Sequence, residues 1–469
     1  MKLRLSSSKV RLIAFIAAAG ALAGSQIAHP SKRILEALGG LILVYLIWNF
    51  STLSALWLLL VIYPFPFAIS LGNSTFVFVV IIFIIYLIRV SARTATIRFD
   101  RQFNLPILLM VMSYIISFYN FQVSPDVMRF GIVHTANFFA AILFFYMIVN
   151  FVDNEERLYR TLRISMVTVV LIMVFTLLEG LFPGRQLIPQ WLYTQHKAQL
   201  VMKGLRMEGP FHDFELNAEF CAINAPIILF LTIRARRLLT RSLFTFILVA
   251  DIVMLFSTVT RGAFISLTVG MVYLAYVTRR DLNFPRLVVI AGAFVALAFI
   301  VDTLVAQYTV SGSLFGRMLE TTFKNGVVPE NRAAAWSGAL SRGFERPFIG
   351  HGPGWDFTKT LGVELWPHNA YLYYFNITGL FGLSAFVFLL VRLVQASLSG
   401  VRSSIMHDSF PEALMKPLHV ALVIFIIDQI KIDYLRNDIY MYFVWLLFGL
   451  IAATRNVIRS REVAPRAEK

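Results

Sequence analysis

The sequence contains few charged residues for its length. Asp, Glu, Lys and Arg make up 14% of its 469 residues, whereas soluble globular domains carry about 25%. Hydrophobic residues make up 58% of the chain, and the mean hydropathy is +0.72. This composition excludes an ordinary soluble domain and indicates a protein that resides in a membrane.

Cysteine is almost absent, because Cys221 is the only one in the chain. A single cysteine excludes an intrachain disulfide and a metal site built from several thiolates. The sequence also shows no long repeat and no low-complexity tract. The paired repeats that are typical of many transporters are therefore not indicated.

Long uncharged runs are what the sequence has in abundance. Runs of about 16 to 26 residues can cross roughly 30 Å of hydrocarbon as helices, which satisfy their own backbone hydrogen bonds. The predicted spans are 12–28, 34–50, 53–71, 75–89, 105–121, 127–150, 163–182, 214–232, 243–258, 262–277, 286–306, 369–391, 414–430 and 437–455. Pro64 and Pro66 interrupt one run, so we expect an all-α polytopic membrane helix bundle with about 12–14 transmembrane helices.

Basic residues give the chain a formal net charge of +16. A nucleic-acid binder is one interpretation, but we favour the excess of Lys and Arg found in cytoplasmic loops of membrane proteins. Basic residues concentrate in alternate connections, which predicts cytoplasmic N- and C-termini and outward-facing loops at 183–213 and 302–368. A cleaved signal peptide ending near Ala23-Gly24-Ser25 is the alternative to an uncleaved first helix.

Three parts of the chain follow from this orientation. Residues 1–301 are expected to form an N-terminal transmembrane bundle, and residues 302–368 a large, partly helical periplasmic loop. Residues 369–469 are expected to form the C-terminal helices and a basic cytoplasmic tail. The large loop carries the basic residues Arg317, Lys324, Arg332, Arg342, Arg346 and Lys359.

His368 closes this loop, where the chain re-enters an apolar run. A neutral imidazole near pH 7 is the usual general base in catalysis. Asn369 is a natural N-cap for a helix that starts at Ala370. The alternative is an interfacial histidine with a purely structural hydrogen bond, but the nearby arginines favour a site.

Arg261 lies between two apolar runs, with only Thr260 and Gly262 as turn residues. A charge so close to hydrocarbon is costly unless it reaches the interface or binds an anion. Backbone amides at the start of the following helix would also face a bound phosphate. An interfacial arginine without a ligand is the alternative.

Arg332 lies at the start of a predicted surface helix, with Asn331 as its N-cap and Trp336, Leu340 and Phe344 on its apolar face. A cation in the first turn is unfavourable by the helix dipole. An anionic ligand there would offset this cost. A solvated arginine on an amphipathic helix is the alternative.

The other outward histidines have weaker settings. His351 lies among glycines and prolines, where it would either line the site or belong to a loop. His212 with Asp213 and Glu208 is a weak metal cluster, but the spacing matches no strong zinc pattern. We therefore expect no metal.

The order of these motifs resembles the O-antigen ligase and O-antigen polymerase superfamily of bacterial envelopes. The resemblance covers roughly residues 200–400, and the first 180 residues match only as generic spans. The matching pieces are Arg206 to Asn217, Thr260 to Ala263, Arg332 with Trp336, Pro347 to Gly354, and His368 to Leu372 followed by Gly379 and Gly382.

The resemblance implies a glycosyltransferase-C-like enzyme of the bacterial inner membrane that needs no cofactor and no metal. It would transfer a glycan from undecaprenyl diphosphate to an acceptor hydroxyl at a periplasmic active site, with inversion. By resemblance, Arg206, Arg261 and Arg332 would bind the diphosphate and His368 would be the base, supported by Asn369, Tyr371, Trp336 and His351.

The acceptor divides the family into two branches. An O-antigen ligase uses lipid A core or a similar anchor, whereas a polymerase uses another repeat unit. We favour the ligase because one outer loop dominates. Membrane lipid is the other expected partner and nucleic acid is not one; a lipid-linked glycan transporter or flippase is the competing class.

Overall fold

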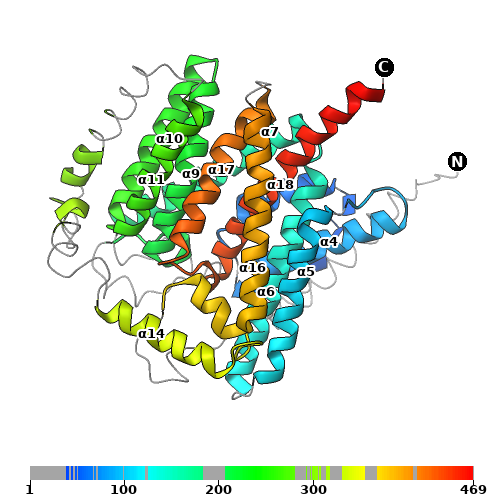
Figure 1. Cartoon of the computed structure of the whole chain (residues 1–469). Coiled ribbons are helices and arrows are strands. Elements are labelled where there is room, and N and C mark those ends of the chain that lie inside the picture. Colours follow the sequence, from blue (N-terminus) through cyan, green and yellow to red (C-terminus); the bar gives the residue numbers. More distant parts are fainter. Residues whose placement is uncertain are drawn as a thin grey trace, which may run out of the picture.

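The computed structural model is almost entirely helical where it describes the chain (Figure 1). The described residues are 39–41, 44–45, 48–49, 51–66, 68–69, 72–98, 100–121, 125–182, 206–279, 292, 296, 298–304, 306–307, 313–316, 319, 330–353, 367–404 and 409–467. The predicted span 12–28, and much of the predicted spans 34–50 and 286–306, lie outside them.

Ten helices of the described chain are long and apolar enough to cross a membrane. They are α4 (Ser74–Ser91), α5 (Arg101–Ser117), α6 (Pro125–Phe151), α7 (Glu155–Leu181), α9 (Phe214–Arg234), α10 (Leu238–Ser257), α11 (Arg261–Thr278), α16 (Ala370–Ser403), α17 (Phe410–Asp428) and α18 (Asp438–Ala467). Short 3-10 turns η1 (Phe118–Asn120), η2 (Gly209–Phe211) and η3 (Tyr434–Arg436) lie between them. The prediction of a polytopic all-helical bundle is confirmed.

The predicted span 53–71 is not one helix. The shorter helix α3 (Thr52–Ile62) ends just before Pro64, which cannot continue a helical hydrogen-bond pattern. The chain then makes a two-residue antiparallel pairing between β1 (Ala68–Ile69) and β2 (Gly72–Asn73). The Asn73 side chain accepts from the Phe76 amide at 2.8 Å and so starts α4.

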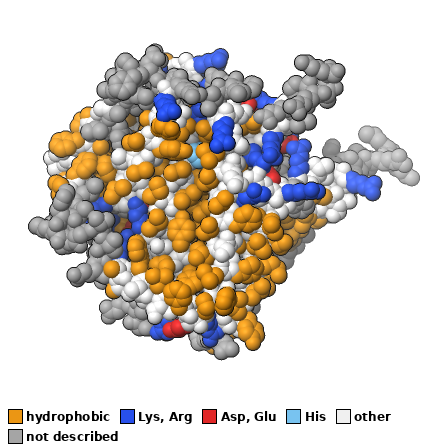
Figure 2. All heavy atoms as spheres, in the orientation of Figure 1, with side chains coloured by type: hydrophobic (Ala, Val, Ile, Leu, Met, Phe, Trp, Pro, Cys, Tyr) orange, Lys and Arg blue, Asp and Glu red, His pale blue; other side chains and the backbone are white. Residues whose placement is uncertain are grey.

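The helices divide into a buried centre and an outer ring. In α18, 94% of the most apolar 18-residue stretch is buried inside the protein. The corresponding share is 78% in α9 and α17 and 28% in α10 and α11. The outward side chains of the outer helices are themselves apolar, for example Leu239, Phe246 and Val272. Figure 2 shows this broad apolar surface, with Lys and Arg gathered mainly toward the end where the C-terminus emerges. This pattern is typical of a membrane-embedded bundle.

Six helix ends meet at the opposite end of the bundle. Helices α9, α11, α16 and α18 begin there, and α10 and α17 end there. Hydrogen bonds join them: the Ala370 amide donates to the Gln429 carbonyl at 2.9 Å, and Asn437 Nδ2 donates to the Phe211 carbonyl at 2.7 Å. Helix α14 (Glu330–Glu345) lies across this end and packs on α16 (Figure 1).

Helix α14 differs from the prediction at its start. It begins at Glu330, so Asn331 lies in its first turn and is not the N-cap. Its packed face is made of the small residues Ala335, Ala339 and Gly343, whereas Phe344 is 67% exposed. Small residues let the helix backbone approach α16 closely, and Asn376 Nδ2 donates to the Ala339 carbonyl at 3.0 Å.

Helix α16 is broken at Gly379, where φ is +66°. The break frees backbone groups, and the segment 347–352 satisfies them. The amides of His351 and Gly352 donate to the Asn376 and Ile377 carbonyls at 2.8 and 3.0 Å. The Leu380 amide donates to the Pro347 carbonyl at 2.7 Å. Residues 347–352 of the predicted Pro347–Gly354 motif thus pair with this break, and Gly354 lies outside the described residues.

Candidate active site

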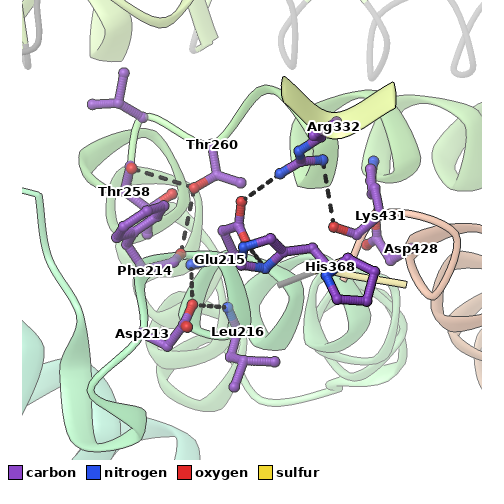
Figure 3. A network of polar contacts seen from close by, with 12 residues as sticks. Asp213, Phe214, Glu215, Leu216, Thr258, Thr260, Arg332, His368, Asp428 and Lys431 are labelled. Atoms are coloured by element: carbon purple, nitrogen blue, oxygen red, sulfur yellow. Dashed lines mark hydrogen bonds and ion pairs between the residues drawn. The ribbon is translucent and has the colours of Figure 1, made fainter. Parts of the chain in front are cut away.

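Glu215 is the centre of a polar cluster at the end where the six helices meet. It lies in the first turn of α9, behind Asp213, whose Oδ1 accepts from the Glu215 and Leu216 amides at 2.8 and 3.1 Å. Glu215 Oε1 accepts from Arg332 Nη2 at 2.8 Å. Figure 3 shows Glu215 between Arg332 on one side and His368 on the other. One carboxylate therefore joins α14, α9 and the start of α16.

Arg436 completes the cluster from the turn η3 between α17 and α18. Its Nη2 donates to Asp213 Oδ1 at 2.7 Å and to Glu215 Oε2 at 3.0 Å, and its Nη1 donates to His368 Nδ1. Burial acts to lower the pKa of Arg436, but the Asp213 and Glu215 carboxylates raise that pKa above its ordinary value. Arg436 is therefore a buried, permanently charged fork.

His368 is held in an unusual backbone conformation, with φ at +46°. Two contacts fix it on either side. Trp336 Nε1 donates to the Pro367 carbonyl at 2.7 Å, and Asn369 Oδ1 accepts from the Leu372 amide at 3.0 Å as the N-cap of α16. A left-handed histidine costs about 1–3 kcal/mol and persists only where its surroundings determine it. The imidazole is thus placed by the fold.

The imidazole of His368 is neutral near pH 7. Burial lowers its pKa below 6.5, and the nearby Arg436 and Arg332 lower it further, while Glu215 opposes them. Because Arg436 donates to Nδ1, the proton of the neutral ring lies on Nε2. Glu215 Oε2 is 3.4 Å from the same Nδ1. The ring can therefore change tautomer if Arg436 moves, since Glu215 would then accept from Nδ1–H.

Arg206 lies beside the cluster but is occupied with the backbone. Its Nε donates to the Thr258 carbonyl at 2.7 Å and its Nη2 to the Val259 carbonyl at 3.2 Å. The guanidinium stacks on the Phe214 ring, 3.3 Å from the ring centroid. These contacts hold the two carbonyls that directly follow α10, so Arg206 positions the break before Arg261.

Arg261 is the first residue of α11, one residue before the start predicted at Gly262. The Thr260 hydroxyl donates to the Phe214 and Thr258 carbonyls, so within the described chain it does not cap the first amides of α11. Gly262 leaves room for a lysine against this helix end: a Cβ there would lie 2.7 Å from Lys431 Nζ. The start of α11 thus combines helix amides with two cationic side chains.

Lys431 is itself fixed by two partners. Its Nζ lies 2.9 Å from Asp428 Oδ1 and donates to Ser266 Oγ at 2.9 Å. Its carbonyl lies 3.5 Å from Arg332 Nη1. The Lys431 backbone therefore connects the start of α11 to the Glu215 cluster.

The structure brings together some of the predicted site residues and separates others. Arg332 and His368 meet at Glu215, and Trp336 and Asn369 hold the backbone around His368. Tyr371 donates to the Ile426 carbonyl at 3.0 Å and ties α16 to α17.

His351 lies away from this group. Its Nε2 donates to the Arg342 carbonyl at 2.9 Å. Arg342 is ten residues beyond Arg332 in α14, or about 15 Å along the helix axis. His351 therefore anchors the 346–353 segment at the opposite end of α14 from Arg332.

Sequence reasoning missed Glu215 and Arg436. Arg436 stands in a short break between two apolar runs, which is the same signal that singled out Arg261. Glu215 stands two residues after Asp213 at the start of a span, where an acidic residue also suits the helix dipole. The break that carries Arg436 could therefore be recognised in the sequence, but the pairing of Arg436 with Glu215 could not.

No group of three or more His, Cys, Asp or Glu side chains in the described chain is arranged to hold a metal ion. Asp213, from the weak cluster predicted with His212 and Glu208, is an ion-pair partner of Arg436 at 2.7 Å. The Asp213 and Glu215 carboxylates of this site form ion pairs with arginines.

The chain matches no protein-family model, and it matches none of the curated proteins. The interpretation of the site therefore depends on its own chemistry.

Proposed function

We propose that the chain is an inverting, metal-independent glycosyltransferase of the O-antigen ligase type, acting on a glycan carried by undecaprenyl diphosphate. The observation that carries the proposal is the cluster of Arg332, Arg436 and His368 around Glu215, at one end of an apolar helix bundle. The donor would have a pyrophosphate at the membrane surface and a tail in the lipid. Guanidinium groups beside an imidazole suit that chemistry.

The start of α11 is the proposed diphosphate site. Arg261, Lys431 and the first amides of α11 supply positive charge there, and Arg332 reaches it through the Lys431 carbonyl. Negative charge on the leaving diphosphate grows as the glycosidic bond breaks. Preorganised guanidinium forks stabilise that charge, because their planar donors match phosphate oxygens. Arg206 acts as a positioning residue behind them.

His368 is the proposed general base, and Arg436 controls when it is available. As the donor binds, Arg436 Nη1 leaves Nδ1 for a phosphate oxygen. The ring then exchanges protons with water, so that Nε2 loses its proton and Nδ1 gains one. The new Nδ1–H donates a hydrogen bond to Glu215 Oε2. Nε2 then takes the proton of the acceptor hydroxyl as the hydroxyl oxygen bonds to the anomeric carbon of the donor. The bond between that carbon and the diphosphate oxygen breaks at the same time.

The proposed active site faces the periplasm. Lys and Arg of the described helices concentrate at the other end of the bundle, for example Arg157, Arg237 and Arg402, which is the cytoplasmic signature of inner-membrane proteins. Helix α18 also ends on that side, which agrees with a cytoplasmic C-terminus. Helix α14 would then lie on the periplasmic side of the membrane.

The direct test is transfer by the purified protein in lipid nanodiscs. The protein is incubated with an undecaprenyl-diphosphate glycan in two separate reactions. One reaction contains a lipid A core acceptor and the other contains a second repeat unit. One shifted lipid product supports the ligase, and a ladder of products assigns the polymerase branch. Movement of intact donor across liposomes without transfer would assign the chain to the transporter class and refute the proposal.

Two controls make this test specific. His368→Ala should lower the transfer rate by about 10²–10⁴-fold, whereas His351→Ala, which changes a histidine at the far end of α14, should leave the chemical step intact. EDTA should leave transfer unchanged. A His368→Ala protein that turns over like wild type would refute the assigned base.

A further inference from the structure

Gln429 is a fully buried amide that the proposed mechanism does not use. It directly follows the last residue of α17, and its exposed fraction is 0%. Buried amides are costly unless their donors and acceptors find partners. The partners of Gln429 therefore show what this residue does in the fold.

Three elements are joined by hydrogen bonds to Gln429. Its Nε2 donates to Glu219 Oε1 in α9 at 2.7 Å, and its Oε1 accepts from the Tyr434 amide in η3 at 3.2 Å. Its backbone carbonyl accepts at 2.9 Å from the amide of Ala370, the first residue of α16. One residue after α17 thus fixes α9, η3 and α16 relative to one another.

Each of these three elements carries a residue of the Glu215 cluster close to its contact with Gln429. Glu215 lies four residues before the α9 contact, which is about one helix turn. Arg436 lies two residues after the η3 contact, and His368 lies two residues before the α16 contact. These three side chains of the cluster are therefore held from one point outside it.

The direction of the Gln429 amide follows from its partners. A backbone amide only donates, so Oε1 must face Tyr434, and Nε2 then faces Glu219. Glu219 is also 0% exposed, so loss of the Gln429 donor would leave a carboxylate oxygen short of a partner in the protein interior. The surrounding segments would shift to restore the missing hydrogen bonds, and the cluster would shift with them.

We infer that Gln429 is a positioning residue that sets the relative places of His368 and Arg436. The donor–acceptor direction of its contact with Glu219 is what this role requires. The effect on the transfer rate rests on the proposed function, whereas the effect on the hydrogen bond between Arg436 and His368 Nδ1 does not. A misplacement of about 1 Å in a reacting group lowers a rate by about 10²-fold.

Two variants of the protein separate hydrogen bonding from volume. Gln429→Leu keeps a similar volume and removes both side-chain hydrogen bonds. The swap Gln429→Glu/Glu219→Gln keeps one amide and one carboxylate but exchanges their places. The amide at position 219 then donates to the carboxylate at position 429, whose second oxygen accepts from the Tyr434 amide. Gln395→Leu is the control, because Gln395 is exposed on α16 and accepts from Arg392 Nη1 at 3.1 Å.

Transfer kinetics and nitrogen-15 NMR of the histidine-labelled protein are the measurements. In Gln429→Leu, kcat should fall by about 10–10²-fold while KM for the donor changes by less than about threefold. His368 should then show both tautomers, because Arg436 no longer donates to Nδ1 in every molecule. The swap should keep the wild-type tautomer and a kcat within about threefold of wild type, and Gln395→Leu should match wild type in both measurements.

The inference would be overturned by a Gln429→Leu protein with the wild-type tautomer and rate, or by a loss that appears in KM alone. A folded swap variant that is as impaired as Gln429→Leu would also overturn it. Melting temperatures identify the folded variants; if Gln429→Leu does not fold, Gln429→Asn, which shortens the side chain, replaces it with the same expected results. If the wild-type protein transfers no glycan, the proposed function fails, and the tautomers of the variants still decide the inference.

Discussion

Arg436 donates to Nδ1 of His368 with the same guanidinium that binds Asp213 and Glu215. The two residues are 68 positions apart and come from different helix ends. This contact gives the histidine a defined tautomer before any substrate is present. It also places the most buried cation of the site where an incoming phosphate would compete for it.

The tautomer of His368 should change when a diphosphate binds. Nitrogen-15 NMR of the histidine-labelled protein should show the proton on Nε2 at rest and on Nδ1 after pyrophosphate is added, because Arg436 then leaves Nδ1. His351, which donates from Nε2 to the Arg342 carbonyl, provides an unaltered reference in the same spectrum. A proton on Nδ1 in the resting protein would contradict the Arg436 hydrogen bond.

The transfer rate should rise with pH in the acidic range and then level. Burial, Arg436 and Arg332 lower the pKa of His368 below 6.5. A general base works only when it is deprotonated, so kcat/KM should fall as pH drops through that lowered pKa and should be level above it. An Arg436→Gln protein should titrate at higher pH. A rate that is flat across this range would exclude a titrating histidine.

Glu215→Gln should destabilise the protein by about 1–3 kcal/mol, because it leaves Arg332 and Arg436 without their shared carboxylate. Pyrophosphate should raise the unfolding temperature of this variant more than that of wild type, because it can bind the released forks. Glu156→Gln is the matched control: Glu156 pairs with Arg160 but is 80% exposed, so its loss should cost about 0–1 kcal/mol. Equal thermal shifts in the two variants would argue against a supporting role for Glu215.

Arg261→Lys should impair transfer strongly while leaving the protein folded. A lysine keeps the charge at the start of α11 but cannot present a planar fork to two phosphate oxygens. We expect a loss of about 10–10³-fold in kcat/KM, measured with the lipid-linked donor. Arg93→Lys, at the other end of the bundle, should have no effect. Activity near wild type in Arg261→Lys would favour an interfacial arginine without a ligand.

Gly379→Ala should lower the unfolding temperature. The glycine has φ of +66°, and a Cβ at this position would overlap the Phe348 backbone. A strained backbone of this kind costs about 1–3 kcal/mol, to which the steric overlap adds. Gly40→Ala is the control, because a Cβ there meets nothing within 4 Å. Unchanged melting of Gly379→Ala would show that the break in α16 can relax.

The parts of the fold that were predictable from the sequence depend on local signals. Apolar run length identified the spans, and Asn369 was predicted as the N-cap of α16 because capping acts within one turn. The break before Arg261 was readable for the same reason. The end of α3 at Ile62 follows from prolines that the sequence displays, although their effect was underestimated.

The parts that were not predictable depend on packing between distant segments. Glu215 and Arg436 are 221 residues apart, and no local pattern pairs them. The packing of α14 on α16 was not predicted, because the small residues that make this contact give no apolar pattern in the sequence. Here Ala335, Ala339 and Gly343 permit a closer approach to α16 than Leu340 or Phe344 would. His351 is a backbone anchor for a break that only the folded α16 creates.

The pairing of segment 347–352 with the α16 break fixes the C-terminal end of α14. From Gly343 back to Arg332 the helix extends about 16 Å, so a tilt of roughly 10° around the anchored end moves Arg332 by about 3 Å. That displacement is comparable to the length of the ion pair that Arg332 makes with Glu215. A small tilt of α14 is therefore sufficient to form or break the ion pair between Arg332 and Glu215, while the end of the helix near Gly343 stays in place.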